Sequence, residues 1–422
     1  MNRLLSYILS CLLVSSCTSH DELLDYALEQ ARSNRHEIEK VLTHYAGDTQ
    51  KQEAARWLVA NMPGHSVMWS EGVQAFADSV MHQGLSQERG NQLWDSLQKI
   101  SATPQKQRDI ETLSAEFLID NIDKAFLAWS ESPWKSEVDF DRFKKYVLPY
   151  RADNELLRIG WRDSLRATYA PVIRDAKTAR EAFECLRKAV NSVKRKGKYD
   201  FPYVMDAVAL RNHYSGVCLE RCVYFTAVCR AFGLPVVIDN CGQWANYSNR
   251  SHTWVALVLD HGTYTVVDED SVARKFNKID ASTFAQNQTM PEDYPYTGEF
   301  KKRLVKVWRQ TFALNPIDDA PLFDDSSARL SSPRLVDVSA EYGLDGKVEI
   351  KPDCEIEDVW LCSHSLSGGW IPQAHAQVKM GKAKFEHISD SVMLLPMGII
   401  EDVKTALGEP FYISNGRKIE LN

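Results

Sequence analysis

The spacing of apolar residues along this 422-residue chain changes near residue 200, and this change constrains the fold most. From residue 21 to about 195, apolar residues recur at steps of three and four, as in Leu113–Trp129 and Glu155–Tyr169. Such spacing is typical of amphipathic helices. Beyond residue 200 they alternate or form short runs between turn residues, as in His252–Leu259, which is typical of strands. We therefore predict an α+β protein in which an all-α region precedes an antiparallel sheet.

One predicted helix stands at this transition and begins near Cys218. It ends at Gly233-Leu234-Pro235, because glycine followed by proline is a common helix stop. Three predicted strands follow it: Val236–Ile238, His252–Leu259 and Tyr264–Val267. The sequence thus predicts one helix packed on an antiparallel sheet.

The three residue types of a thiol acyl-transfer site lie in order on these elements. Cys218 is at the helix start, His252 follows 34 positions later, and Asp268 follows 16 positions after that. A cysteine attacks a carbonyl as the thiolate, which a neighbouring base generates. A carboxylate behind the imidazole orients that base. Asp270 is a rival for Asp268, but the run Val266-Val267 favours Asp268.

These residues belong to a pattern that resembles the transglutaminase-like cysteine superfamily. The pattern is Gly-x-Cys ending at Cys218, Arg-x-x-Gly-Leu-Pro starting at Arg230, His-x-Trp starting at His252, and Val-Val-Asp ending at Asp268. The resemblance implies a papain-like core with Cys218 as nucleophile, His252 as base and Asp268 as orienting carboxylate. More loosely, Leu148–Arg151 and Trp161-Arg162 are similar to a segment that precedes this core in secreted bacterial members.

The remaining residues near the motif receive supporting roles. The start of the helix lowers the pKa of a thiol there and offers backbone N–H groups to an oxyanion. Gln243 or Trp244 is expected to supply a second oxyanion donor, with Gln243 preferred. We expect the others to have structural roles: Cys222, Cys229 and Trp254 in the core, Arg230 at the helix end or paired with a carboxylate, and His213 in a solvated loop.

The first 17 residues resemble a bacterial lipoprotein signal. Arg3 precedes the apolar run Leu4–Val14, which is too short to span a bilayer. Val14-Ser15-Ser16-Cys17 is similar to a lipobox, so Cys17 is the expected lipidation site. The alternatives are an ordinary signal peptide cut after Ser16 and a short hydrophobic anchor. The lipobox predicts a lipid-anchored protein of the bacterial outer membrane that faces the periplasm or the cell surface.

The sequence of the C-terminal part predicts a separate β-domain. Residues 315–334 are rich in Pro, Asp and Ser, which is typical of a linker. Short alternating segments beyond it predict a small β-sandwich, in which Trp360, Trp370 and Phe385 are core residues rather than a sugar-stacking surface. The expected domains are a signal peptide (1–17), a helical region (18–195), a transglutaminase-like catalytic domain (196–314), a linker (315–334) and a β-domain (335–422).

Composition limits the classes of function. The formal charge of −7 argues against a nucleic-acid partner. The absence of a CxxC pair argues against a structural zinc site, and we expect neither metal nor cofactor. The interpretation that results is a thiol hydrolase that acts on amide bonds of peptides or glycopeptides through a thioester. Two alternatives stay open: a cross-linking protein-glutamine acyltransferase, and a non-catalytic surface lipoprotein that binds peptide or glycan.

Overall fold

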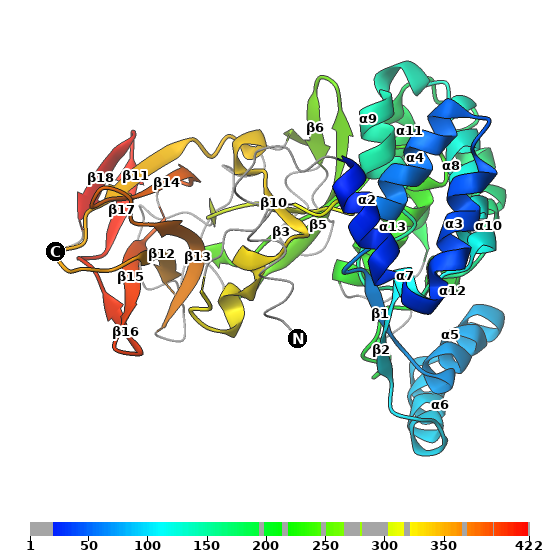
Figure 1. The fold of residues 1–422 in the computed structure, drawn as a ribbon, viewed down its shortest axis with the longest axis horizontal. Coiled ribbons are helices and arrows are strands. Elements are labelled where there is room, and N and C mark those ends of the chain that lie inside the picture. The colour runs from blue at the N-terminus through cyan, green and yellow to red at the C-terminus, as the bar shows by residue number, and fades with distance from the viewer. Residues whose placement is uncertain are drawn as a thin grey trace. The chain divides into compact units, whose positions relative to one another are not determined.

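The computed structural model describes residues 20–193, 198–212, 218–245, 250–265, 279–280, 303–315, 321–364, 369–390 and 392–420. The chain divides into two compact units. The first unit comprises Met1–Ile238, Leu257–His261 and Thr311–Leu314, and the second comprises Asp239–Ala256, Gly262–Gln310 and Asn315–Asn422. Helices dominate the first and antiparallel strands the second (Figure 1), so the protein has the predicted α+β character.

The helices of the first unit begin at local capping signals. The hydroxyl of Thr178 accepts a hydrogen bond from the Glu181 backbone N–H (3.2 Å), and Ser114 does the same for Phe117 (3.2 Å). Such caps satisfy backbone donors that the helix itself leaves free. The helices and helical turns are α2 (His20–Gln30), η1 (Arg32–Asn34), α3 (Arg35–His44), α4 (Thr49–Ala60), α5 (Glu71–Gln83), α6 (Gln87–Ile100), α7 (Asp109–Thr112), α8 (Ala115–Ser130), η2 (Lys135–Glu137), α9 (Phe140–Arg142), η3 (Phe143–Val147), α10 (Trp161–Tyr169), η4 (Ala170–Ile173), α11 (Ala179–Ser192), α12 (Ala207–Asn212) and α13 (Cys218–Arg230).

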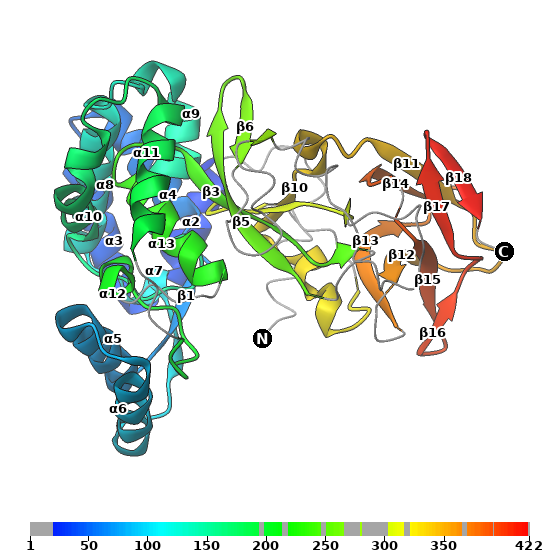
Figure 2. The ribbon, with the colours of Figure 1, turned by 180° about the vertical axis from the view of Figure 1, so that it is seen from behind.

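A two-stranded ribbon interrupts the helices, so the prediction of an all-α region is wrong in this respect. β1 (Ser66–Trp69) pairs antiparallel with β2 (Gln105–Arg108). Between them the chain forms α5 and α6, which lie side by side in both views (Figures 1 and 2). The residues of β2 are all polar, so no alternation of apolar and polar residues marked this strand.

A second departure concerns the predicted helix from Glu155 to Tyr169. The helix α10 begins only after Gly160, whose φ of 72° is in the left-handed region. Before it, the buried carboxylate of Glu155 accepts hydrogen bonds from the backbone N–H groups of Ala152 (2.6 Å) and Asp153 (2.8 Å). These hydrogen bonds close a tight turn in place of a helical turn.

A short segment from far along the chain completes the first unit. The ring of Phe312 stacks on the buried ring of His65, with 4.1 Å between centroids, and the Phe312 carbonyl lies 3.1 Å from His65 Nε2. The backbone N–H of Leu314 donates to Asn61 Oδ1 (2.9 Å). Residues 311–314 therefore belong to a unit formed mostly by the first half of the chain, and Phe312 is part of its buried core.

A six-stranded sheet has the order β10-β9-β3-β5-β6-β7. The predicted strands from Val236 and His252 are confirmed as β3 and β5, whereas the end of the third predicted strand, residues 266–267, lies outside the described residues. β10 pairs with β9 in this sheet, although its sequence was assigned to the C-terminal domain. A further pair joins β4 to β8. The bounds are β3 (Val236–Cys241), β4 (Trp244–Ala245), β5 (His252–Leu259), β6 (Gly262–Thr265), β7 (Ile279–Asp280), β8 (Arg303–Leu304), β9 (Trp308–Gln310) and β10 (Leu335–Asp337).

The C-terminal residues form two further antiparallel sheets. One has the order β13-β12-β15-β17-β18, with β16 paired to β15, and the other joins β11 to β14. Trp360 and Phe385 are buried, as expected of core residues, and Trp370 is half-buried. The strands are β11 (Gly346–Ile350), β12 (Asp358–His364), β13 (Trp370–Gln377), β14 (Ala383–Ile388), β15 (Leu394–Ile400), β16 (Val403–Ala406), β17 (Phe411–Ser414) and β18 (Arg417–Glu420).

The described part of the expected linker, residues 321–334, is packed rather than extended. It contains the helical turn η6 (Asp325–Ser331). Phe323 and Ser327 are buried, and Arg329 donates hydrogen bonds to the Pro372 carbonyl (2.7 Å) and Gln373 Oε1 (2.9 Å) on β13. Some polar side chains of this segment therefore form hydrogen bonds in the interior of the unit. The predicted domain boundaries themselves stay predictions.

Candidate active site

Cys218 is the first residue of α13, as predicted, and its side chain is half-buried. The other two cysteines of this helix, Cys222 and Cys229, are buried, and burial raises the pKa of the Cys229 thiol. Their predicted role as core residues is confirmed. The cysteines of the described ranges form no disulfide with one another. Cys218 is therefore the thiol of α13 that a reactant can reach.

The C-terminal end of α13 is held by the buried guanidinium of Arg230. This group donates hydrogen bonds to the backbone carbonyls of Tyr146 (2.9 Å), Pro149 (3.3 Å) and Arg151 (2.7 Å). Burial lowers its pKa to about 10. Of the two roles expected for Arg230, packing at the helix end is confirmed.

Arg162 on α10 ties the same helix end to the upstream segment. Its guanidinium donates to the carbonyls of Arg230 (2.7 Å) and Val147 (2.7 Å) and to Asn121 Oδ1 (3.0 Å). The side chain is fully buried, which lowers its pKa. The segments Leu148–Arg151 and Trp161-Arg162 therefore pack against α13.

After the helix, Gly233 allows the chain to turn back closely against α8. Its φ is 72°, and a Cβ there would lie 2.6 Å from the Ala128 carbonyl oxygen, so this turn requires glycine. The carbonyl of Pro235 then accepts a hydrogen bond from the Val258 N–H (2.9 Å). The position of the helix is thus set at its C-terminal end, and the thiol lies at the opposite end.

Glu220 adds a titratable group to the first turn of α13. Burial raises the pKa of its carboxyl to about 7, opposed by the positive charge of Lys198. A carboxyl that changes charge near neutral pH two residues from Cys218 makes the electrostatic field at the thiol dependent on pH.

In the second unit, His252 is the first residue of β5 and its imidazole packs against two indoles, which also contact each other (6.4 Å between centroids). The ring centroids of Trp244 and Trp254 lie 5.6 Å and 5.9 Å from that of His252. Both indoles are buried, which confirms the predicted packing role of Trp254. These contacts restrict the rotation of the imidazole.

A hydrogen-bonded network fixes the indole of Trp254 through its N–H group. Its indole N–H donates to the Tyr342 hydroxyl (2.7 Å), which donates to Asp239 Oδ2 (2.8 Å). Arg309 donates to both oxygens of Asp239 (2.9 Å each) and both of Glu341 (2.9 and 2.8 Å). Sequence reasoning missed this network, because its members lie on β3, β9 and η7 (Ser339–Tyr342) and share no local motif.

Gln243, the preferred oxyanion donor, forms hydrogen bonds with residues far along the chain. Its buried amide donates to the His364 carbonyl (2.8 Å) and accepts hydrogen bonds from the Ser363 hydroxyl and from Gln373 Nε2 (3.3 Å). The group joins the loop after β3 to strands β12 and β13. Its position in sequence, close to His252, did not reveal these distant partners.

The other predicted site residues lie outside the described ranges, namely Cys17, His213, Asp268 and Asp270. Cys218 belongs to the first unit and His252 to the second, and each is described with the residues of its own unit. Across the described ranges, no group of His, Cys, Asp and Glu side chains could hold a metal ion. No helix of the described chain is long and apolar enough to cross a membrane.

Comparison with known families agrees with the motif. Residues 167–269 match the family model of the transglutaminase-like superfamily, so the chain carries a transglutaminase-like domain. The matched segment includes Cys218, His252 and Asp268. The superfamily generally contains cysteine-dependent enzymes. No curated protein and no solved structure matches the chain.

Proposed function

We propose that the protein is a cysteine hydrolase that cleaves amide bonds of peptides or glycopeptides, with Cys218 as nucleophile, His252 as base and Asp268 as orienting carboxylate. One observation carries this proposal. Within the transglutaminase-like segment, Cys218 begins a helix with an accessible thiol, whereas Cys222 and Cys229 of the same helix are buried. A thiol at a helix start lies in the field that favours its thiolate.

The proposed reaction proceeds through a thioester. His252 takes the proton of the Cys218 thiol, and the sulfur attacks the amide carbonyl carbon to form a C–S bond. When the tetrahedral intermediate collapses, the C–N bond breaks and the leaving amine takes the proton from the imidazolium. His252 then deprotonates a water molecule that attacks the thioester carbonyl carbon. The C–S bond breaks, the carboxylic acid leaves, and the sulfur takes the proton from the imidazolium, which restores the thiol. Backbone N–H groups at the start of α13 are the first oxyanion donors.

Gln243 and Trp244 are both kept as candidates for the second oxyanion donor. One N–H of the Gln243 amide donates to the His364 carbonyl, and the amide nitrogen carries a second N–H. Trp244 contacts the ring of His252.

Two other functions use the same residues. If an amine attacks the thioester in place of water, the protein is an acyltransferase that cross-links proteins. If no thioester forms, it is a surface protein that binds peptide or glycan. We favour hydrolysis, because the chain shows no calcium-ligand pattern of the kind found in animal cross-linking enzymes.

The decisive experiment compares the full mature chain with Cys218→Ala and the matched control Cys222→Ala. Each is incubated with peptide and glycopeptide libraries, with and without a fluorescent primary amine, and all products are weighed by mass spectrometry. We expect hydrolysed products, lost by about a thousandfold or more in Cys218→Ala and kept in Cys222→Ala. Incorporation of the amine in excess of hydrolysis would identify an acyltransferase, and turnover that survives in Cys218→Ala would refute the site.

Thiol labelling tests the state of the nucleophile without a known substrate. We expect iodoacetamide at pH 6 to alkylate Cys218 faster than a free thiol, because His252 and the helix start favour the thiolate. His252→Ala is expected to abolish this advantage. Labelling of Cys218 at the rate of a free thiol, unchanged by His252→Ala, would support a binding protein.

We further propose that Cys17 is lipidated and that the protein is anchored in the bacterial outer membrane. The support is the lipobox Val14-Ser15-Ser16-Cys17 after a short apolar run. The test is the Cys17→Ser variant, which is expected to leave the membrane fraction and to lose incorporation of labelled fatty acid. Protease treatment of whole cells then distinguishes the surface from the periplasmic face.

A further inference from the structure

The imidazole of His252 lies against the rings of two buried indoles in a nearly parallel arrangement. Its centroid is 5.6 Å from that of Trp244 and 5.9 Å from that of Trp254, and the ring planes are inclined by 34° and 29°. A cation within about 6 Å of an indole centroid is attracted by the electron-rich face of the ring. A protonated imidazole is such a cation, so these contacts favour the imidazolium form over the neutral form.

Local structure brings both indoles to the histidine. Residues two apart on a strand point to the same face of a sheet, so Trp254 lies beside His252 on β5. The backbone N–H of Trp244 donates to the Arg250 carbonyl (3.3 Å), which places Trp244 next to the start of the same strand. Both indoles therefore have fixed positions relative to the imidazole.

The Trp254 indole is also connected to a buried carboxylate through a tyrosine. Burial, together with the Asp239 carboxylate, raises the pKa of Tyr342 well above its ordinary value, so its hydroxyl keeps the proton that it donates to Asp239. The same oxygen accepts the hydrogen bond of the Trp254 N–H (2.7 Å). Hydrogen bonds in such a chain polarise one another in the protein interior. Polarisation of the N–H bond toward a carboxylate increases the electron density of the indole face.

The charges of this network favour a cation as well. Among the described residues, one guanidinium, that of Arg309, is shared by the carboxylates of Asp239 and Glu341. Asp239 is fully buried, so solvent screens its charge little. Arg250, the cationic residue two positions before His252, is exposed to solvent, which screens its charge. A surplus of negative charge near the imidazole stabilises its protonated form.

Much of this network lies beyond the segment that matches the transglutaminase-like family. The match ends at residue 269, whereas Arg309 is on β9, and Glu341 and Tyr342 are on η7. These residues and His252 belong to the same unit. Elements that follow the family segment in sequence therefore contribute to the surroundings of the proposed base.

We propose that Trp244 and Trp254 form an aromatic cage that stabilises the imidazolium of His252, and that Tyr342 and Asp239 are positioning residues that hold and polarise the Trp254 ring. This inference rests on the proposed role of His252 as base. In that role the imidazole takes the proton of the nucleophilic thiol, so a stabilised imidazolium keeps the sulfur as thiolate before a substrate binds. The aromatic cage thus prepares the nucleophile through the base.

The test is an NMR titration of the His252 imidazole in the full mature chain with isotope-labelled histidine. The Cys218→Ala background removes the coupled titration of the thiol, and loss of one signal in His252→Gln assigns the resonance. We expect Tyr342→Phe, which keeps the ring but removes the hydroxyl, to lower the titration midpoint by about half a pH unit. This change corresponds to about a threefold lower ratio of imidazolium to imidazole at a given pH.

Each positioning residue has a matched control. Tyr45→Phe removes a tyrosine hydroxyl that donates to Asp123 (3.0 Å) in the first unit, and it should leave the midpoint of His252 unchanged. An unchanged midpoint in Tyr342→Phe, or an equal decrease in Tyr45→Phe, would overturn the proposal.

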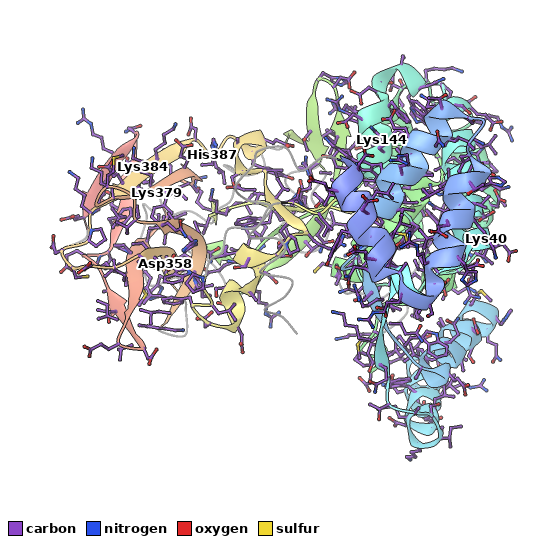
Figure 3. All side chains as sticks on the ribbon, viewed as in Figure 1. Lys40, Lys144, Asp358, Lys379, Lys384 and His387 are labelled. Atoms are coloured by element: carbon purple, nitrogen blue, oxygen red, sulfur yellow. The ribbon has the colours of Figure 1, made fainter. Side chains whose placement is uncertain are left out.

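Asp239→Asn tests the carboxylate at the end of the chain and is expected to lower the midpoint at least as much as Tyr342→Phe. The control is Asp358→Asn, which removes a half-buried carboxylate of the same unit that pairs with His375 (2.8 Å) and is labelled in Figure 3. Equal decreases for the two aspartate variants would reduce the effect to a general loss of negative charge and refute the role of Asp239.

Alkylation by iodoacetamide at pH 6 connects the aromatic cage to the nucleophile. We expect Tyr342→Phe, with Cys218 intact, to slow alkylation of Cys218 by about threefold, while the exposed Cys354 serves as internal reference. A lower midpoint of His252 without slower alkylation of Cys218 would support the aromatic cage but refute His252 as the base of this thiol. Failure of the aromatic cage and failure of the proposed function are thereby told apart.

Discussion

Two buried arginines of the first unit, Arg162 and Arg230, are satisfied in a different way from Arg309 of the second unit. In the first, the hydrogen bonds of Arg162 and Arg230 go to backbone carbonyls and to the amide of Asn121. In the second, Arg309 lies between the carboxylates of Asp239 and Glu341. A carbonyl is polar without a net charge, so removing the arginine leaves unpaired dipoles in the first unit. Removing Arg309 leaves an uncompensated negative charge in the second unit, where Asp239 is fully buried.

The comparison predicts the largest effect for Arg309→Leu. Loss of one partner of a buried ion pair costs about 3–5 kcal/mol of the free energy of unfolding. We also expect lower activity, because the network holds Trp254 against His252. Chemical denaturation and turnover of the best library substrate are the measurements.

The matched control is Arg35→Leu, which breaks an exposed pair with Glu39 (2.7 Å) and should cost about 1 kcal/mol or less. The double variant Asp239→Leu/Arg309→Leu removes both charges and should recover part of the loss. If the double variant is no more stable than Arg309→Leu, uncompensated charge is not the reason for the effect.

The second largest loss in the free energy of unfolding is expected for Arg162→Lys. A lysine offers three donors at one nitrogen and cannot reach the spread of acceptors around Arg162, so we expect a cost of about 2–4 kcal/mol. The control is Arg166→Lys, one turn later on α10 and partly exposed. Equal stability of the two variants, measured by denaturation, would show that the carbonyl array does not hold α13.

The third prediction concerns the pH dependence of stability. Burial raises the pKa of Glu220 to about 7 from its ordinary value of 4.5. Between these values the folded chain holds a proton that the unfolded chain releases, so this residue lowers stability as the pH rises from 4.5 to 7. Glu220→Gln should remove that decline and stabilise the protein by about 2–3 kcal/mol at pH 8 relative to pH 4.

Glu116, an exposed acid in the first turn of α8, is the matched control for Glu220. Thermal unfolding of Glu220→Gln and Glu116→Gln from pH 4 to pH 8 is the measurement. Parallel curves for the natural chain and Glu220→Gln would contradict burial of the Glu220 carboxyl.

The sequence predicted the features that depend on neighbouring residues. The start of α13 at Cys218 and its end before Gly233 and Pro235 follow from local helix signals, and the strand from His252 follows from alternation. The helix expected from Glu155 failed because a buried carboxylate closed a turn there. An apolar pattern gives no indication of such a turn.

Features that join distant residues were beyond sequence reasoning. Asp239 and Arg309 are 70 positions apart, and Asp239 and Tyr342 are 103 apart. Gln243 was assigned to the oxyanion because of its place before His252, yet its partner Ser363 is 120 positions away. No periodicity or motif within one segment records such partners.

The contribution of residues 311–314 to the first unit has a practical consequence for dissecting the protein. A fragment that stops at residue 310 keeps the described α-helices, α2 to α13, but loses the ring that covers His65 and the N–H that binds Asn61. A fragment that stops at 238 also loses Leu257–His261, which belong to the same unit. Gene truncation at either place would remove part of the helical unit, so the functions of the two units are better separated by point substitutions than by deletion.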